Sequence, residues 1–168
     1  MTPQRPDVGD PGRSLRLTPE WIVGFIDGEG CFHIGISKHA DLRIGYQILP
    51  ELTVVQHERD LDLLHELRSV MDCGVVRRNH GDRFCWRVRN LKNLTGVIIP
   101  FFDKNPLKSK KHLDFMKFRK VVMMMQEGKH LLKEGFREIA KIASEMNRAQ
   151  PRIKLDLRES PSQDENLG

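Results

Sequence analysis

Two carboxylates, Asp27 and Glu29, stand between glycines at the end of the decapeptide WIVGFIDGEG, residues 21–30. The apolar residues before them predict a short helix, so both acids fall at its C-terminal end. The helix macrodipole is negative there, and a further anion is disfavoured by roughly 0.3–1 kcal/mol unless a cation compensates. Carboxylate and carbonyl oxygens are ligands that Mg²⁺ prefers. We therefore interpret the helix end as a divalent-metal site; the simpler alternative is a glycine-rich turn with solvated carboxylates.

The predicted helix begins near residue 19, because Thr18 can cap the first turn and Pro19 suits the first helical position. Apolar side chains then point in every direction around it, so we expect the helix to be buried on all sides. Gly24 and Gly28 are four residues apart and share one face, which lets another backbone approach closely. This face predicts a seam between two helices.

The whole decapeptide resembles the signature of the LAGLIDADG homing endonucleases, in the variant with an aromatic residue, glycine and glutamate at the variable places. The resemblance implies that Glu29 binds the divalent cation that cuts DNA, Mg²⁺ or another such as Mn²⁺, with help from the Gly28 carbonyl. It implies a supporting role for Asp27 at the helix end. By alignment with the family, Gln56 orders water and Lys108 stabilises charge near the scissile phosphate.

The decapeptide occurs once in the chain. In the resembled family, single-motif members form homodimers in which the motif helix packs against its copy. We therefore expect an interface built on Trp21, Gly24, Phe25 and Gly28. A two-fold dimer would bring two Glu29 carboxylates together and favour a long, nearly palindromic DNA target.

Period-two patterns predict four strands, and helical spacing predicts the elements between and after them. The predicted strands are 31–37, 46–55, 75–79 and 83–89. A covering helix is predicted over 60–71, and later helices over 91–102, 108–126 and 131–146. This order favours an α+β fold, an αββαββα core with a four-stranded antiparallel saddle-shaped sheet and extra C-terminal helices, as in homing endonucleases. Pro50 marks a bulge or an edge in the second strand. Leu113, Met116, Val121 and Met124 are expected to face inward.

One face of the predicted sheet is polar, with core-facing residues such as Ile48, Leu52 and Trp86 on the other. Arginine suits bidentate contacts with guanine edges and phosphates, so the polar face fits the major groove of double-stranded DNA. An ordinary solvated face is the alternative. The candidate DNA-binding residues are His33, Ser37, Gln47, Glu51, Thr53, Arg77, Asn79, Arg83, Arg87 and Arg89.

The composition fits one compact domain, at 168 residues and 39% hydrophobic content. We expect the domain over residues 17–148, a flexible leader over 1–16 and a disordered tail over 149–168. No stretch is long and apolar enough to cross a bilayer, which predicts a soluble intracellular protein, in a bacterial cytoplasm or an organelle. Three widely spaced cysteines predict reduced thiols.

Positive charge is concentrated between residues 77 and 120, which contain thirteen Lys and Arg against three Asp, although the net charge is only +5. Such a cluster suggests a polyanion as partner. The main alternative function is a non-cleaving intron maturase or another DNA- or RNA-binding protein with the same scaffold. Both acids of the motif are present, which favours the enzyme. A more distant alternative is a soft-metal site formed by Cys31, His33 and His39, whose spacing fits no standard site.

Overall fold

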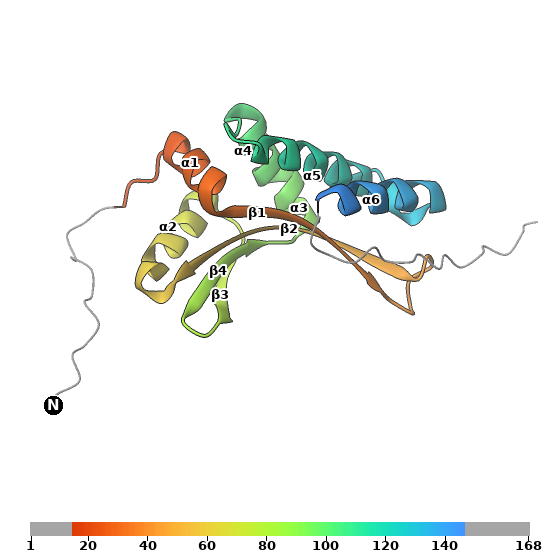
Figure 1. Ribbon diagram of the computed structural model, residues 1–168, viewed down its shortest axis with the longest axis horizontal. Coiled ribbons are helices and arrows are strands. Elements are labelled where there is room, and N and C mark those ends of the chain that lie inside the picture. Colours follow the sequence, from red (N-terminus) through yellow and green to blue (C-terminus); the bar gives the residue numbers. More distant parts are fainter. Residues whose placement is uncertain (1–14, 147–168) are drawn as a thin grey trace, which may run out of the picture.

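The computed structural model describes residues 15–146 as helices on one side of a four-stranded antiparallel sheet, with strand order β1-β2-β4-β3 (Figure 1). The predicted α+β fold and element order are confirmed. The leader and tail expected over residues 1–16 and 149–168 lie outside the described residues, apart from residues 15 and 16. The elements are α1 Pro19–Glu29, β1 Gly30–Lys38, β2 Tyr46–His57, η1 Glu58–Asp60, α2 Leu61–Met71, β3 Val75–His80, β4 Arg83–Val88, α3 Leu91–Asn93, η2 Leu94–Ile98, α4 Ile99–Lys104, α5 Lys111–Gln126, η3 Lys129–Leu131 and α6 Lys133–Met146.

Helix α1 begins as the sequence predicts, because Thr18 Oγ1 accepts a hydrogen bond of 3.2 Å from the Trp21 amide. Ile22, Val23 and Ile26 are buried against the sheet. The prediction that α1 is buried on all sides is wrong for the single chain, since Trp21 is 42% exposed and Gly24 and Gly28 are also exposed. The helix therefore has one covered face and one bare face.

Strands β1 and β2 form the long arch of the sheet (Figure 1). Ile34, Leu52 and Val54 are buried beneath the helices, in agreement with the predicted alternation. Pro50 pairs with Ile34 of β1, whereas β4 pairs with β2 only from Leu52 to His57. The proline thus lies where β2 has an edge, and its missing N–H removes no bond to β4.

The β3–β4 hairpin is tied to the core by Trp86, whose Nε1 donates a 2.9 Å hydrogen bond to the Cys73 carbonyl. Gly74 has φ +85°, and an added Cβ would lie 2.5 Å from Trp86 Nε1, so only glycine fits this turn. All three cysteines are free, as expected. Cys85 is fully buried although its position in β4 alternates with the core residues.

Helix α5 differs from the prediction in where it starts and in which side chains it buries. It begins at Lys111 rather than Lys108, because the Lys108 and Ser109 amides bind the Asp27 carboxylate instead of starting the helix. Leu113 and Met116 are 61% and 46% exposed, so their predicted inward placement is wrong.

Two phenylalanines decide which side of α5 faces the core. Phe115 and Phe118 pack around Phe32, with ring centroids 5.5 and 5.2 Å away. Leu113 is two residues from Phe115 and therefore points to nearly the opposite side of the helix. The predicted inward positions Val121 and Met124 are buried.

The remaining C-terminal elements follow the prediction with two changes. The helical segment expected over residues 91–102 contains a π-helical turn, η2, and runs on through α4. Leu131 and Leu132 are exposed and precede α6, which begins at Lys133. The buried face of α6 is formed by Phe136, Ile139, Ile142 and Ala143, as expected.

Candidate active site and nucleic-acid interface

The two acids of the motif have different surroundings. Glu29 is the last residue of α1 and is exposed to solvent, as is Gly28 before it. Asp27 is partly covered by the segment that leads into α5. Glu29 is therefore the acid of this pair that is open to an incoming ligand.

Asp27 binds the start of that segment through four donor contacts. Its Oδ2 accepts a 2.7 Å hydrogen bond from the Lys108 amide, and its Oδ1 accepts one of 2.7 Å from Ser109 Oγ. The Ser109 amide lies 3.2 and 3.3 Å from the two oxygens. Burial alone would raise the pKa of Asp27, but these hydrogen bonds and nearby Lys111 lower it below its ordinary value of 3.8. Asp27 is thus a structural anion, in line with its predicted supporting role.

Lys111 makes the opposite contact, since its Nζ donates a 3.1 Å hydrogen bond to the Ile26 carbonyl in the last turn of α1. The Asp27 carboxylate at the end of α1 thus accepts hydrogen bonds from the segment that begins α5. The Lys111 ammonium group at the beginning of α5 donates one to a carbonyl at the end of α1. Each charge lies where the other helix end stabilises it. We call Ile26, Asp27, Lys108, Ser109 and Lys111 the helix-end clamp.

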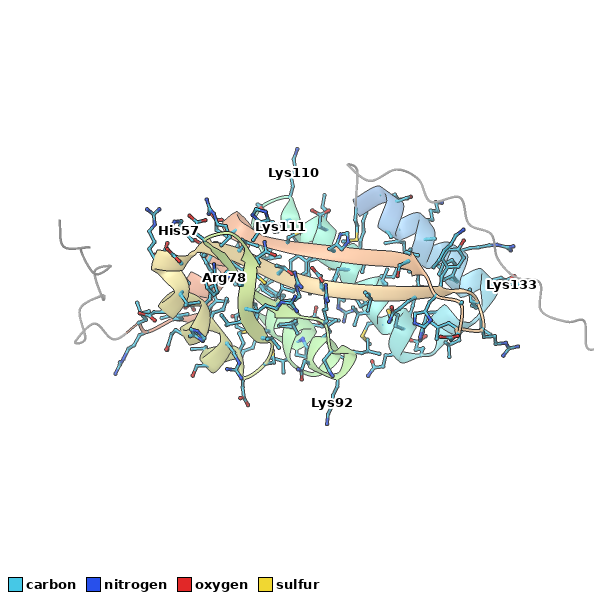
Figure 2. The ribbon with its side chains drawn as sticks, turned by 90° about the horizontal axis from the view of Figure 1, so that it is seen from below. His57, Arg78, Lys92, Lys110, Lys111 and Lys133 are labelled. Atoms are coloured by element: carbon cyan, nitrogen blue, oxygen red, sulfur yellow. The ribbon has the colours of Figure 1, made fainter. Side chains whose placement is uncertain are left out.

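The clamp joins parts of the chain that are more than 80 residues apart and fixes the backbone from which the Lys108 side chain extends. Figure 2 shows Lys111 turned in toward the start of β1, whereas Lys110 extends away from the molecule. Lys108 is exposed. The predicted pair of Glu29 and Lys108 therefore lies on two segments that are joined by the side chains of Asp27 and Lys111.

The register of the sheet brings Gln56 to the same end of α1. Gly30, which follows Glu29, pairs with Val54, and Gln56 is two residues further along β2. Gln56 is half-buried, and His57 after it forms a 2.9 Å contact between its Nε2 and Asp82 Oδ2. The end of β2 is thereby tied to the turn between β3 and β4.

The donor set at the helix end consists of one exposed carboxylate and a backbone carbonyl, which suits a hard divalent cation. Within residues 15–146 no group of three or more His, Cys, Asp or Glu side chains is close enough to hold a metal ion. A metal at Glu29 would therefore need further oxygen ligands from DNA, water or a second copy. The same finding gives no support to a soft-metal site at Cys31, His33 and His39.

The bare face of α1 carries the residues predicted for the dimer interface. Trp21 and Phe25 stack with ring centroids 4.8 Å apart and 27° between their planes. A Cβ added at Gly24 or Gly28 would meet nothing within 4 Å. This face is apolar, flat at the glycines and uncovered in the single chain.

The predicted DNA-binding side chains gather on the face of the sheet opposite the helices, which Figure 2 shows from below. His33 pairs with Glu51, Ser37 with Gln47, and Thr53 with Arg87. Directly paired residues share a face of a sheet. Arg77 and Arg83 extend this face toward the β3–β4 turn, and Asn79 lies at an irregularity of the β3–β4 pairing.

Glu51 has contacts that the sequence pattern did not predict. It accepts a 2.6 Å hydrogen bond from Arg89 Nε and one of 2.9 Å from Thr53 Oγ1, and Arg87 Nε lies 3.7 Å away. Four of the candidate DNA-binding residues thus bind one another. The alternating acid and arginines on neighbouring strands were the signal that could have revealed this cluster.

Ion pairs engage several positive charges on both the helical side of the molecule and the open face of the sheet. On the helical side Lys120 contacts Glu138 at 2.6 Å, Arg119 contacts Asp103 at 3.0 Å and Lys117 contacts Glu145 at 3.5 Å. On the sheet, Arg87 and Arg89 contact Glu51 and Arg83 lies 3.9 Å from Asp82, whereas Arg77 has no ion pair within the described part of the chain. The charge of Arg77 is therefore available to a polyanion at the open face.

A family model described as LAGLIDADG endonuclease matches residues 22–122, more than half of the chain. Over 119 residues the chain is 33% identical to an uncharacterized 50.9 kDa protein in ND4 intron 1 of Podospora anserina, covering 70% of this chain and 26% of that protein. It is 32% identical over 133 residues to probable intron-encoded endonuclease 2 of Neurospora crassa, covering 78% of this chain and 29% of the relative. The chain therefore spans between a quarter and a third of the length of these two proteins.

Solved structures show the same fold. The crystal structure of the homing endonuclease I-TnaI is 50% identical, with a TM-score of 0.77 over 80% of this chain and 90% of that one. I-SmaMI, bound to an uncleaved DNA target in the presence of calcium ions, is 28% identical with a TM-score of 0.76, over 87% of this chain and 55% of that one. No helix in the described residues has the length and apolar character needed to span a membrane.

Proposed function

Because the chain belongs to the LAGLIDADG endonuclease family, we propose that it is a site-specific endonuclease that cuts double-stranded DNA as a homodimer with a divalent metal ion. The observation that carries this proposal is the helix-end clamp, which holds the Lys108 segment against the end of α1 while Glu29 stays exposed. Cutting requires an anionic ligand and a cation near one phosphate, and the clamp supports this proposal because it holds the backbone of Lys108 at the end of the helix that carries Glu29.

Glu29, with the Gly28 carbonyl, is the proposed holder of Mg²⁺ or Mn²⁺. The metal would polarise the phosphate and lower the pKa of a bound water. Lys108 would stabilise negative charge on the phosphate, and Gln56 would orient water at the end of β2. Asp27 touches neither DNA nor metal in this proposal; it keeps Lys108 in place.

The proposed target is a long, nearly palindromic duplex that lies against the open face of the sheet. The arched shape of β1 and β2 suits the major groove, and arginine side chains there can read guanine edges. I-SmaMI, which shares the fold, has been solved bound to DNA. Because the proposed target is DNA, the protein would act inside the cell.

The homodimer follows from the single motif and the bare face of α1. Two copies related by a two-fold axis would bury Trp21, Gly24, Phe25 and Gly28 of each chain and bring the two Glu29 residues together. Each chain would then contribute one carboxylate to the cutting centre, which fits the one exposed acid, Glu29, at the C-terminal end of α1.

Selection of cleaved molecules from a random duplex library tests the proposal. With Mg²⁺ the wild type should enrich a long, nearly symmetric site, and the same library with EDTA should enrich none. Enrichment only of bound, uncut duplexes, even with Mg²⁺ or Mn²⁺, would overturn the cutting reaction and leave a DNA-binding protein. Binding to intron RNA in preference to any duplex would instead support the maturase alternative.

A further inference from the structure

Glu51 lies on the open face, where it pairs with His33 of β1 and contacts Arg87 of β4 and Arg89 just after it. Its side chain is only 14% exposed. A carboxylate at this place repels the phosphates of any DNA that lies on the sheet. Its presence on a DNA-binding face therefore needs a physical reason.

The contacts of Glu51 supply that reason. Arg89 Nε donates at 2.6 Å and Thr53 Oγ1 donates at 2.9 Å, so both carboxylate oxygens are engaged, and Arg87 Nε completes the cluster at 3.7 Å. Burial alone would raise the pKa of Glu51, but the hydrogen bonds from Arg89 and Thr53 and the charge of Arg87 lower it below the ordinary value. The carboxylate is thus ionised at neutral pH and balances part of the arginine charge.

Both arginines turn Nε, one of the five N–H groups of a guanidinium, toward Glu51; Arg89 donates a hydrogen bond from it, whereas Arg87 forms an ion pair at 3.7 Å without a hydrogen bond. The other four remain for DNA. A guanidinium held at one edge loses rotational freedom, and its remaining donors keep a fixed direction. Fixed direction matters for bidentate contacts with guanine, whereas contacts with phosphates tolerate many orientations.

We propose that Glu51 is a positioning residue for sequence recognition, which directs Arg87 and Arg89 toward base edges. It also cancels part of their charge, which weakens their contacts with the phosphates of any DNA sequence. This inference rests on the proposed function, because it concerns the sheet face as a DNA-reading surface. Glu51 itself makes no base contact in this scheme.

Glu51→Gln tests the charge, because glutamine keeps the shape and removes the anion. Binding is measured with Ca²⁺ in place of Mg²⁺, on a non-cognate duplex and on the selected target, at several salt concentrations. We expect non-cognate affinity to rise about threefold or more near 0.1 M salt, with a salt slope steeper by about 0.9 for each additional phosphate that the protein neutralises. The ratio of target to non-cognate affinity should fall about tenfold.

Glu51→Asp separates orientation from charge, because aspartate keeps the anion but draws its oxygens back by one methylene. We expect its salt slope to match the wild type while its discrimination falls. Glu145→Gln is the matched control, since it removes an exposed carboxylate that pairs with Lys117 on the helical side. It should change neither quantity. Circular dichroism melting confirms that each variant is folded.

Two results would overturn the inference. If Glu51→Gln leaves non-cognate affinity and salt slope unchanged, the carboxylate does not restrain the arginines. If it changes preference at one base pair only, Glu51 reads that base directly. The non-cognate measurement needs no cleavable target, so its outcome can be separated from failure of the wild type to cut.

Discussion

The end of α1 and the open face of the sheet both hold acids against bases, but they do so in opposite ways. At the end of α1, Asp27 is bound through backbone amides and a hydroxyl, and its partner Lys111 binds a carbonyl. On the sheet, Glu51 contacts the side chains of Arg87 and Arg89, so acid and bases are joined there through side chains rather than through the main chain. The first region fixes the position of the main chain, whereas the second sets the direction of side chains on an open face.

This difference fits two separate tasks. Hydrolysis at a phosphate needs groups held within a fraction of an ångström, and main-chain hydrogen bonds provide such positions. Recognition of many base pairs needs side chains that can be replaced by other residues without disturbing the fold. We therefore expect substitutions at the helix end to affect the cutting rate, and substitutions on the sheet to affect binding.

The largest expected effect is the loss of cutting in Glu29→Gln. Without the carboxylate the proposed metal site would lose its side-chain ligand, and we expect the single-turnover rate to fall on the order of 1000-fold, or about 4 kcal/mol. Affinity for target DNA in Ca²⁺ should stay within about threefold. Glu20→Gln, which changes an exposed acid at the other end of α1, is the control and should cut normally. Full activity of Glu29→Gln would separate the helix end from the chemistry.

A smaller effect, loss of the proposed dimer, is expected from Gly24→Glu, because this change places a carboxylate in the centre of the bare face of α1. The single chain has room for it, since a Cβ at this position meets nothing within 4 Å. In a dimer seam the charge would be buried without a partner, at a cost of about 3 kcal/mol to association. Light scattering after size exclusion should show monomers. Val70→Glu, on the exposed side of α2, should leave the dimer intact; an unaffected dimer in both variants would place the interface elsewhere.

Arg77→Ala and Arg83→Ala should each weaken target binding or relax sequence choice, on the order of 1–3 kcal/mol. Arg77 has no competing ion pair in the described residues, so its whole charge is available to DNA. Titrations at several salt concentrations measure the effect, with Lys120→Ala on the helical side as control. At saturating protein the cutting rate should be near that of the wild type. Unchanged binding by both variants would remove the sheet from the recognition surface.

The smallest effect concerns the clamp itself. Asp27→Asn should lower the free energy of unfolding by about 1 kcal/mol at pH 7, because the amide is a weaker acceptor for the Lys108 and Ser109 amides. The folded-state pKa of Asp27 is lowered, so its stabilisation is present above pH 3.8 and is lost as the pH falls through that lowered value.

Urea unfolding at pH 7, 5 and 3 should therefore show a gap between wild type and Asp27→Asn that narrows at the lowest pH. Asp62→Asn in the first turn of α2 is a matched change outside the clamp. A constant gap at all three pH values would mean that Asp27 stabilises the fold through something other than its charge.

The sequence was sufficient for the order of the elements, because alternation and helical spacing record which side of each element is buried. It also pointed to the end of α1 as a candidate site, since acids at a helix C-terminus are unfavourable without a partner, and the resemblance to the LAGLIDADG signature assigned the metal to Glu29, which stays a prediction. The roles of Leu113 and Met116 were wrong because α5 has apolar residues on two sides, and only the packing of Phe115 and Phe118 against Phe32 decides between them. The clamp joins residues more than 80 positions apart and leaves no local pattern, whereas the Glu51 cluster is visible in the sequence only as an acid and arginines that alternate on neighbouring strands.

Direct location of the metal is the most informative measurement. Crystals of the protein with its selected duplex and Mn²⁺ would give an anomalous signal that marks the ion without assumptions about its ligands. We expect the peak at the end of α1, coordinated by the Glu29 carboxylate and the Gly28 carbonyl, with Lys108 beside the nearest phosphate. A peak coordinated by other protein groups, with Glu29 turned away from the cut phosphate, would contradict the assignment of this helix end as the cutting centre.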